Sequence, residues 1–106
     1  MFVSLIPVVV RGDSMEPTLR DGDRVVVRRL GRAPRAGEVV LVPDPRLPAR
    51  SLLKRIAAIR PDGALLAGDR PEHSTDSRQF GPVDPGSIEG RVLFRYAPLR
   101  RAGRIR

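Results

Sequence analysis

The sequence predicts a small, mainly β domain, built as a folded sheet or barrel. Eleven prolines and ten glycines in 106 residues interrupt the chain too often for long helices. Between these breaks lie short runs rich in valine, isoleucine and leucine, which are typical of strands. A chain of this length has the usual size of one domain, so we expect a single domain over residues 1–106.

The apolar runs and the turn signals between them place the elements in order. RDGD at 20–23 is a turn signal, and RPDG at 60–63 predicts a hairpin. The stretch 68–86 has little apolar content, so we expect a long ordered loop of the kind that often carries function. The predicted strands are Leu5–Arg11, Asp23–Leu30, Glu38–Val42, Leu52–Arg60, Ala64–Ala67 and Ile88–Tyr96.

The charge and composition limit the classes of partner. The formal net charge of +8 predicts attraction to nucleic acid, anionic lipid or an acidic protein. Aromatic residues make up only 4%, which leaves few rings for bases to stack on, so we expect no nucleic-acid partner. We expect residues 97–106, which include four arginines, to form a solvated basic tail. With no cysteine and the single histidine His73, we expect no metal and no cofactor.

Lys54 is the one lysine in the chain; the other nineteen basic residues are arginines. Arginine stays charged, whereas a desolvated lysine can lose its proton and act as a base. Alternation along the strand 52–60 leaves both faces mostly apolar, so periodicity does not decide whether Lys54 or Arg55 is buried. An apolar setting would lower the pKa of the lysine by penalising its charged form. Chance codon usage is the alternative explanation of the single lysine.

The best candidate partner for this lysine is Ser14, in the stretch RGDSMEPTLRDGD at 11–23. Gly12 permits a tight backbone just before the serine, and Pro17 biases Glu16 toward an extended conformation. Ser14 therefore lies in a stiff, non-helical segment between two strands, where its hydroxyl can be presented. An ordinary turn serine is the alternative.

Several stretches, in the same order, resemble the characteristic boxes of the type I signal peptidases. Together they cover residues 12–96, which is most of the chain. The serine box is GDSMEPTLRDGDRVVV, the next strand box is GEVVLV, the lysine box is LLKRIAAI, the last box is GDRPEHSTDSRQFGPV, and the closing strand is IEGRVLFRY.

The resemblance implies a serine endopeptidase with a Ser-Lys dyad, on a mainly β fold of the signal peptidase and LexA-like protease type. In this assignment Ser14 is the nucleophile, Lys54 is the general base, and Ser74 orients the lysine amine. The backbone N–H of Ser14 is the first choice of donor to the oxyanion. The remaining residues matched near the site are assigned structural roles: Asp69, Asp76 and Arg78.

Some features depart from the family pattern. The family normally carries N-terminal membrane anchors, whereas no stretch here approaches the roughly 20 apolar residues that a spanning helix needs. Arg70 replaces the asparagine of Gly-Asp-Asn, and Gly12 replaces a serine that many members offer to the oxyanion. The small chain is similar to anchor-free bacterial proteases that trim nickel-type superoxide dismutase. We therefore expect a precursor protein as substrate and a bacterial cytoplasmic location, with peripheral membrane contact left open.

Other interpretations stay open from the sequence alone. A LexA-like self-cleaving protease shares the serine turn and a later lysine, but it normally needs an upstream segment, and thirteen residues precede Ser14. A non-catalytic basic β-barrel that binds nucleic acid fits the net charge. An inactive relative is kept open by Arg70 and Gly12.

Two further side chains have alternative roles. His73 could join Ser14 and Asp76 in a Ser-His-Asp triad, but a lone histidine in a polar loop is usually solvated, and Lys54 already fills the role of base. Met15 could line a substrate groove or pack in the core.

Overall fold

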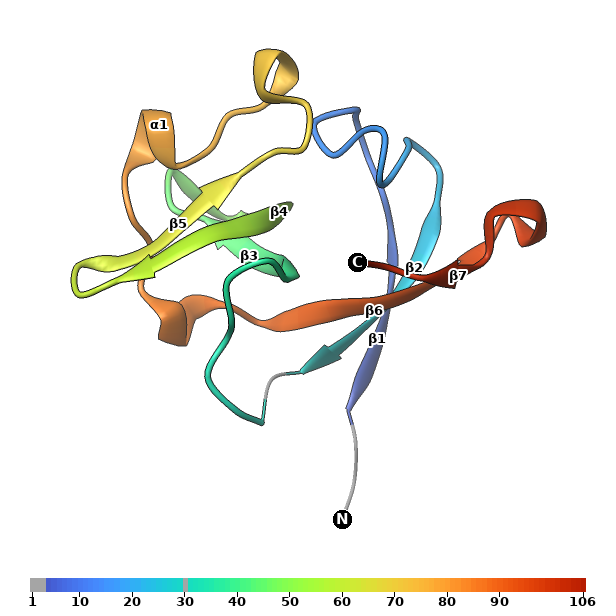
Figure 1. The fold of residues 1–106 in the computed structure, drawn as a ribbon, viewed down its shortest axis with the longest axis horizontal. Coiled ribbons are helices and arrows are strands. Elements are labelled where there is room, and N and C mark those ends of the chain that lie inside the picture. The colour runs from blue at the N-terminus through green and yellow to red at the C-terminus, as the bar shows by residue number, and fades with distance from the viewer. Residues whose placement is uncertain (1–3, 30) are drawn as a thin grey trace.

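The computed structural model describes residues 4–29 and 31–106, which form one strongly curled antiparallel sheet of seven strands (Figure 1). The strand order is β1-β2-β6-β3-β4-β5, and β7 pairs with β6. The prediction of a mainly β fold is confirmed. The strands are β1 (Leu5–Val9), β2 (Arg24–Arg29), β3 (Val39–Asp44), β4 (Leu47–Arg60), β5 (Gly63–Ala67), β6 (Gly90–Ala97) and β7 (Gly103–Arg104). The short helical turns are η1 (Pro71–His73), α1 (Ser77–Phe80), η2 (Pro85–Ser87) and η3 (Leu99–Arg101).

Each of the six predicted strands has an observed counterpart, but β4 begins at Leu47 instead of Leu52. The added residues follow a tight turn in which buried Asp44 accepts hydrogen bonds from the backbone and side chain of Arg46. They are exposed, so no apolar run marks them in the sequence. The predicted hairpin at 60–63 joins β4 to β5. Leu30, which ends the second predicted strand, lies outside the described residues.

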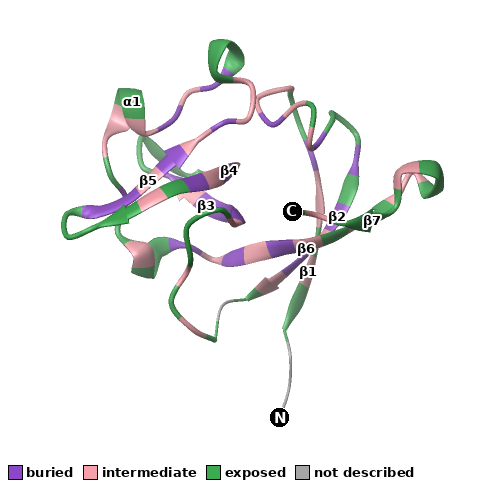
Figure 2. Cartoon of the chain, in the orientation of Figure 1, coloured by how far each residue is buried: buried purple, intermediate pink, exposed green. Residues whose placement is uncertain are grey.

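Strand β3 is buried on both faces and divides the core into two clusters (Figure 2). Val39 and Leu41 belong to the first cluster, and Val40 and Val42 belong to the second. This arrangement follows from the alternation of side chains along a strand that has neighbours on both edges. A central strand of this kind fixes the segments that pack on it from either side.

The two core clusters hold the segments that carry the candidate serine and lysine. Met15 and Leu19, which flank the serine turn, are 2% and 0% exposed and pack in the first cluster. Ile56, two residues after Lys54, is fully buried in the second cluster. Burying a side chain of this size contributes about 1.5–3 kcal/mol. Met15, for which groove and core were both considered, is a core residue that also borders the cavity described below.

Residues 97–106, expected to form a solvated tail, are mostly exposed, but they fold back onto the sheet through Arg101 and Ile105. Asp23 is 2% exposed and accepts hydrogen bonds from Arg95 and Arg101 at 2.7–3.1 Å. Burial alone would raise the pKa of Asp23, but hydrogen bonds from the Arg20 backbone and from Arg101 outweigh it, and the pKa is lowered. Ile105 packs against the first core cluster. A buried carboxylate that needs cations is the physical reason for the ordered tail.

We predict that Arg101→Ala destabilises the fold by about 1–3 kcal/mol, because it removes two hydrogen bonds from a buried carboxylate. Thermal unfolding followed by circular dichroism measures the effect. Arg100→Ala is the matched control, since Arg100 is exposed and forms no ion pair among the described residues. Equal melting temperatures for the two variants would contradict the assigned role of Arg101.

Candidate active site

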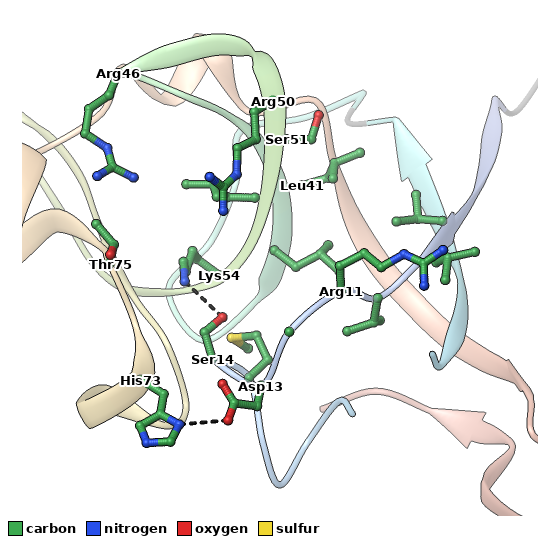
Figure 3. Close-up of a pocket in the computed structure, with 17 residues that line it drawn as sticks. Arg11, Asp13, Ser14, Leu41, Arg46, Arg50, Ser51, Lys54, His73 and Thr75 are labelled. Carbon is green, nitrogen blue, oxygen red and sulfur yellow. Dashed lines mark hydrogen bonds and ion pairs between the residues drawn. The ribbon is translucent and has the colours of Figure 1, made fainter. Parts of the chain in front are cut away.

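Three segments that are distant in the sequence meet at the amine of Lys54. The amine lies 3.0 Å from Ser14 Oγ and 3.0 Å from Ser74 Oγ (Figure 3 shows the first contact). Lys54 is in the middle of β4 and is 3% exposed, Ser14 is in the turn after β1, and Ser74 is in the loop after β5. Of the two charged neighbours in β4, the lysine is therefore the more deeply buried.

The turn that carries Ser14 is held by its backbone. Gly12 adopts a φ of +79°, a conformation that favours glycine, and its N–H donates to Asp21 Oδ1 at 2.8 Å. The carbonyl of Ser14 accepts a hydrogen bond from the N–H of Arg70 at 2.8 Å. Within the described part of the chain, the N–H of Ser14 has no acceptor. This N–H is therefore free to bind a ligand oxygen.

A buried carboxylate orients Ser74. The hydroxyl of Ser74 donates to Asp76 Oδ2 at 3.1 Å. The lone pairs of the Ser74 hydroxyl oxygen therefore stay available to accept from the lysine amine. Asp76, 1% exposed, also accepts from the Gly68 N–H at 3.2 Å and from Arg78 Nε at 3.0 Å. Burial would raise the pKa of Asp76, but these hydrogen bonds outweigh it and lower the pKa. Asp76 is therefore a carboxylate at neutral pH.

The surroundings of Lys54 favour the neutral amine. Burial is the largest cause and lowers the pKa of Lys54 below its ordinary value of 10.5. The nearby charges of Arg50 and Arg46 lower the pKa further, while Asp76 and Asp44 oppose them. A protonated lysine at this position would lose much of its hydration without a direct carboxylate partner, because its two hydrogen-bond partners are hydroxyls.

Asp69 lies beside the site and, among the described residues, forms no hydrogen bond with Ser14, Lys54 or Ser74. It accepts from Arg55 Nε and Nη2 at 2.9 and 2.8 Å, and from the hydroxyl of Thr18. The hydrogen bond from Arg55 is the main reason why the pKa of Asp69 is lowered. Asp69 therefore joins the serine turn, the lysine strand and the loop after β5.

A second ionic contact, which the sequence did not reveal, joins the same loop to the serine turn. His73 Nδ1 lies 2.7 Å from Asp13 Oδ2, and Arg70 Nη1 lies 3.2 Å from the same oxygen. The hydrogen bond with His73 lowers the pKa of Asp13. His73 is thus half-exposed and hydrogen-bonded to Asp13, and among the described residues it bonds to neither Ser14 nor Asp76. In the sequence, the feature that could have indicated this contact is that Asp13 and His73 each directly precede a serine of the site.

A cavity of about 510 Å³ opens over Ser14 and Lys54 (Figure 3). One wall is formed by residues 8–11, at the end of β1, and the other by residues 50–54 of β4. Among the described residues, both walls have an unpaired strand edge: β1 pairs with β2 alone, and β4 pairs with β5 only from Arg55 onward. An extended peptide that enters the cavity meets free backbone groups on both sides.

The structure is thus a curled β sheet with an open cleft. In that cleft, a buried amine lies between two serine hydroxyls. The comparisons with known proteins give the family. Residues 1–63, which include Ser14 and Lys54, match the family described as signal peptidase, peptidase S26. The chain belongs to this family of peptidases, which favours the signal peptidase assignment over the LexA-like alternative.

The chain is also similar to several membrane proteases. It is 31% identical to mitochondrial inner membrane protease subunit 1 of Homo sapiens, over 93% of this chain and 74% of the relative. Mitochondrial inner membrane protease subunit 2 of Schizosaccharomyces pombe is 30% identical, over 91% and 67%. Mitochondrial ATP-independent inner membrane protease subunit 1a of Arabidopsis thaliana is 35% identical, over 92% and 73%.

These relatives overturn the expected location. We expected a protein of the bacterial cytoplasm, because the sequence shows no anchor, whereas the relatives are named for the mitochondrial inner membrane. The cytoplasmic assignment is therefore wrong. Across residues 4–29 and 31–106, no helix is long and apolar enough to cross a membrane.

We predict that Gly68→Ala disturbs the site, because an added Cβ would overlap the side chain of Ser74 and approach Ser14 O to 2.7 Å. The expected result is a loss of about 1–3 kcal/mol in the free energy of unfolding, together with reduced peptidase activity. Gly31→Ala is the matched control, since nothing lies within 4 Å of its added Cβ. Chemical denaturation and a peptide cleavage assay measure the two effects. Wild-type behaviour of Gly68→Ala would show that the close approach is not needed.

Proposed function

We propose that this chain is a serine endopeptidase that hydrolyses one peptide bond in a precursor protein. Ser14 is the nucleophile and Lys54 is the general base. The observation that carries this proposal is the buried Lys54 amine, 3.0 Å from Ser14 Oγ, at the floor of an open cavity. This distance lies within the hydrogen-bond reach that proton transfer requires.

The first step is attack on the substrate carbonyl. A serine hydroxyl is a weak nucleophile until a base accepts its proton. The neutral amine donates one N–H to Ser74 Oγ, and this contact turns its lone pair toward the hydroxyl of Ser14. As Ser14 Oγ bonds to the carbonyl carbon, its proton moves to Lys54 Nζ and the carbonyl oxygen becomes an oxyanion.

The unpaired N–H of Ser14 is the first proposed donor to this oxyanion. A fixed donor of this kind typically lowers the barrier by about 3–4 kcal/mol. Gly12 brings no side-chain donor, and its own N–H is used by Asp21. A second donor is not assigned.

The reaction is then completed in two stages, breakdown of the intermediate to an acyl ester and hydrolysis of that ester. The Lys54 ammonium gives its proton to the leaving nitrogen, the C–N bond breaks, and an acyl ester on Ser14 remains. The neutral amine next takes a proton from a water molecule that attacks the ester. The proton returns to Ser14 Oγ as the C–O bond breaks, which releases the new carboxyl terminus and restores the site.

The strand edges align the substrate. An extended segment can pair with the free edge of β1 on one wall and with residues 50–54 of β4 on the other. Backbone pairing on both sides would fix the scissile carbonyl over Ser14 with little dependence on the substrate's side chains. A substrate held this way has already lost translational and rotational entropy on binding, so less entropy is lost in the transition state and attack is faster.

The substrate class follows from the family and from the names of the relatives. We propose a precursor protein from which an N-terminal segment is removed at a membrane surface. None of the three relatives described above is named for superoxide dismutase, so the proposal stops at the class of precursor.

The proposal predicts that Ser14→Ala, Lys54→Met and Lys54→Arg each lose at least about a thousandfold in kcat/KM, because each removes the nucleophile or the neutral base. Ser74→Ala should lose about ten- to a hundredfold, since the amine remains but is poorly oriented. A pooled library of ten-residue peptides with alanine before the scissile bond, analysed by mass spectrometry, measures cleavage. Ser4→Ala is the matched control, because Ser4 is exposed and does not line the cavity. Full cleavage by Ser14→Ala or Lys54→Arg would refute the mechanism.

A pH profile of kcat/KM tests the protonation state. Activity should rise with pH and reach a plateau, because only the neutral Lys54 accepts a proton, and the midpoint should lie below 10.5 because burial lowers the lysine pKa. The same shift makes folding less favourable as the pH falls from 10.5 toward the folded-state pKa, and Lys54→Met lacks this contribution. Activity that falls with rising pH over this window would argue against lysine as the base.

A further inference from the structure

The rim of the cavity above Lys54 holds two guanidinium groups, of which one is ion-paired with a carboxylate. Arg46 and Arg50 both line the cavity (Figure 3). Asp44, 1% exposed, accepts from Arg46 Nε and Nη2 at 3.1 and 2.9 Å. The side chain of Arg50 forms no hydrogen bond and no ion pair in the described part of the chain. One positive charge is therefore left over at this rim.

The charge of Arg50 acts on the site. It lowers the pKa of Lys54 and the pKa of Asp44, as a nearby cation does. Figure 3 shows its side chain extending from the upper wall toward Lys54. A guanidinium without a counter-ion is repelled by other positive charges nearby. An anion placed between the charges would remove this repulsion.

Nothing else along the cavity neutralises this charge. Asp13 is the one carboxylate among its described lining residues, and it is already bonded to His73 and Arg70. On the opposite wall Arg11 is exposed and likewise has no ion pair among those residues. With a neutral lysine, the cleft carries an excess of positive charge that faces the space for the substrate.

We propose that Arg50 is a subsite for a carboxylate of the substrate, so that this peptidase prefers precursors with Asp or Glu near the scissile bond. The inference rests on the proposed function, whose cleft and strand edges it uses. Guanidinium groups bind carboxylates in a bidentate, charge-assisted geometry. Arg50 precedes Lys54 by four residues in the same strand, and a paired substrate advances at the same rise per residue. The acidic residue therefore lies within about four positions of the scissile bond.

The strand geometry also predicts how the preference depends on position. Successive side chains of an extended substrate point to opposite sides, so a glutamate at one position faces Arg50 and a glutamate at the next position does not. A general attraction between a basic protein and an acidic peptide would show no such alternation. Position dependence therefore separates a subsite from the effect of the net charge of +8.

The test uses alanine-rich ten-residue peptides that carry a single glutamate, moved through the four positions on either side of the scissile bond. Each is compared with the peptide that has glutamine at the same place. We expect kcat/KM to be about three- to tenfold higher for glutamate at the preferred position, and the difference to shrink in 0.5 M salt. Equal rates for every glutamate and glutamine pair would overturn the proposal.

Variants assign the preference to Arg50. Arg50→Gln should abolish it, and Arg50→Glu should invert it in favour of lysine at the same position. Arg60→Glu is the matched control, because this substitution changes the net charge by the same amount as Arg50→Glu. Arg60 is exposed in the same strand and does not line the cavity. The preference is the ratio of kcat/KM for two peptides on the same variant, so any effect of Arg50 on the pKa of Lys54 cancels. A preference that survives in both Arg50 variants, or is lost in Arg60→Glu, would overturn the assignment.

Binding separates this proposal from the catalytic one. The same peptides, labelled with fluorescein, are titrated against Ser14→Ala by fluorescence anisotropy. If glutamate peptides bind more tightly and Arg50→Glu reverses the order, while the wild type cleaves none of them, the subsite stands and the peptidase mechanism fails. If the wild type cleaves the library but affinity does not depend on glutamate, the mechanism stands and the subsite fails.

Discussion

The burial of a single amine is the constraint on which the site depends. In the part of the chain that the structure describes, Lys54 has no carboxylate as a direct partner, and the hydrogen-bond partners of its amine are two serine hydroxyls. The sheet holds it there because the lysine side chain lies in a strand paired with β3, the strand that is buried on both faces. Burial makes the charged form costly and lowers the pKa of Lys54, which is what the proposed role as a neutral base requires.

Ionic and hydrogen-bonded contacts outside the central group bring the three segments together. Asp76 fixes the direction of the Ser74 hydroxyl, Asp69 joins the lysine strand to the serine turn through Arg55, and Asp13 joins that turn to His73. Each carboxylate has at least one cation or N–H donor of its own, so none of them bonds to the lysine amine. The carboxylates around the site are therefore satisfied by groups other than the Lys54 amine.

The sequence predicted most of the fold and the three side chains that the structure brings together, for identifiable reasons. Apolar runs located the strands, because a strand that contributes to the core needs apolar side chains, and a single lysine among arginines marked a position with distinct chemistry. The exposed start of β4 and the folded tail were missed, since the first depends on an Asp44 turn and the second on ion pairs to Asp23. Such contacts join residues far apart in the chain, or occur in exposed segments, and leave no periodic signal. The contact between His73 and Asp13 was missed for the same reason.

Measuring the pKa of the Lys54 amine is the most direct test of this account, and the amino-acid composition makes the measurement simple. Because the chain has one lysine, labelling with ¹³C-lysine gives a single side-chain Cε signal that can be followed by NMR as a function of pH. The account predicts a midpoint below 10.5, and a midpoint that rises toward 10.5 when the protein is unfolded in denaturant. A folded-state midpoint at or above 10.5 would contradict it, because the amine would then be charged and could not accept the proton of Ser14.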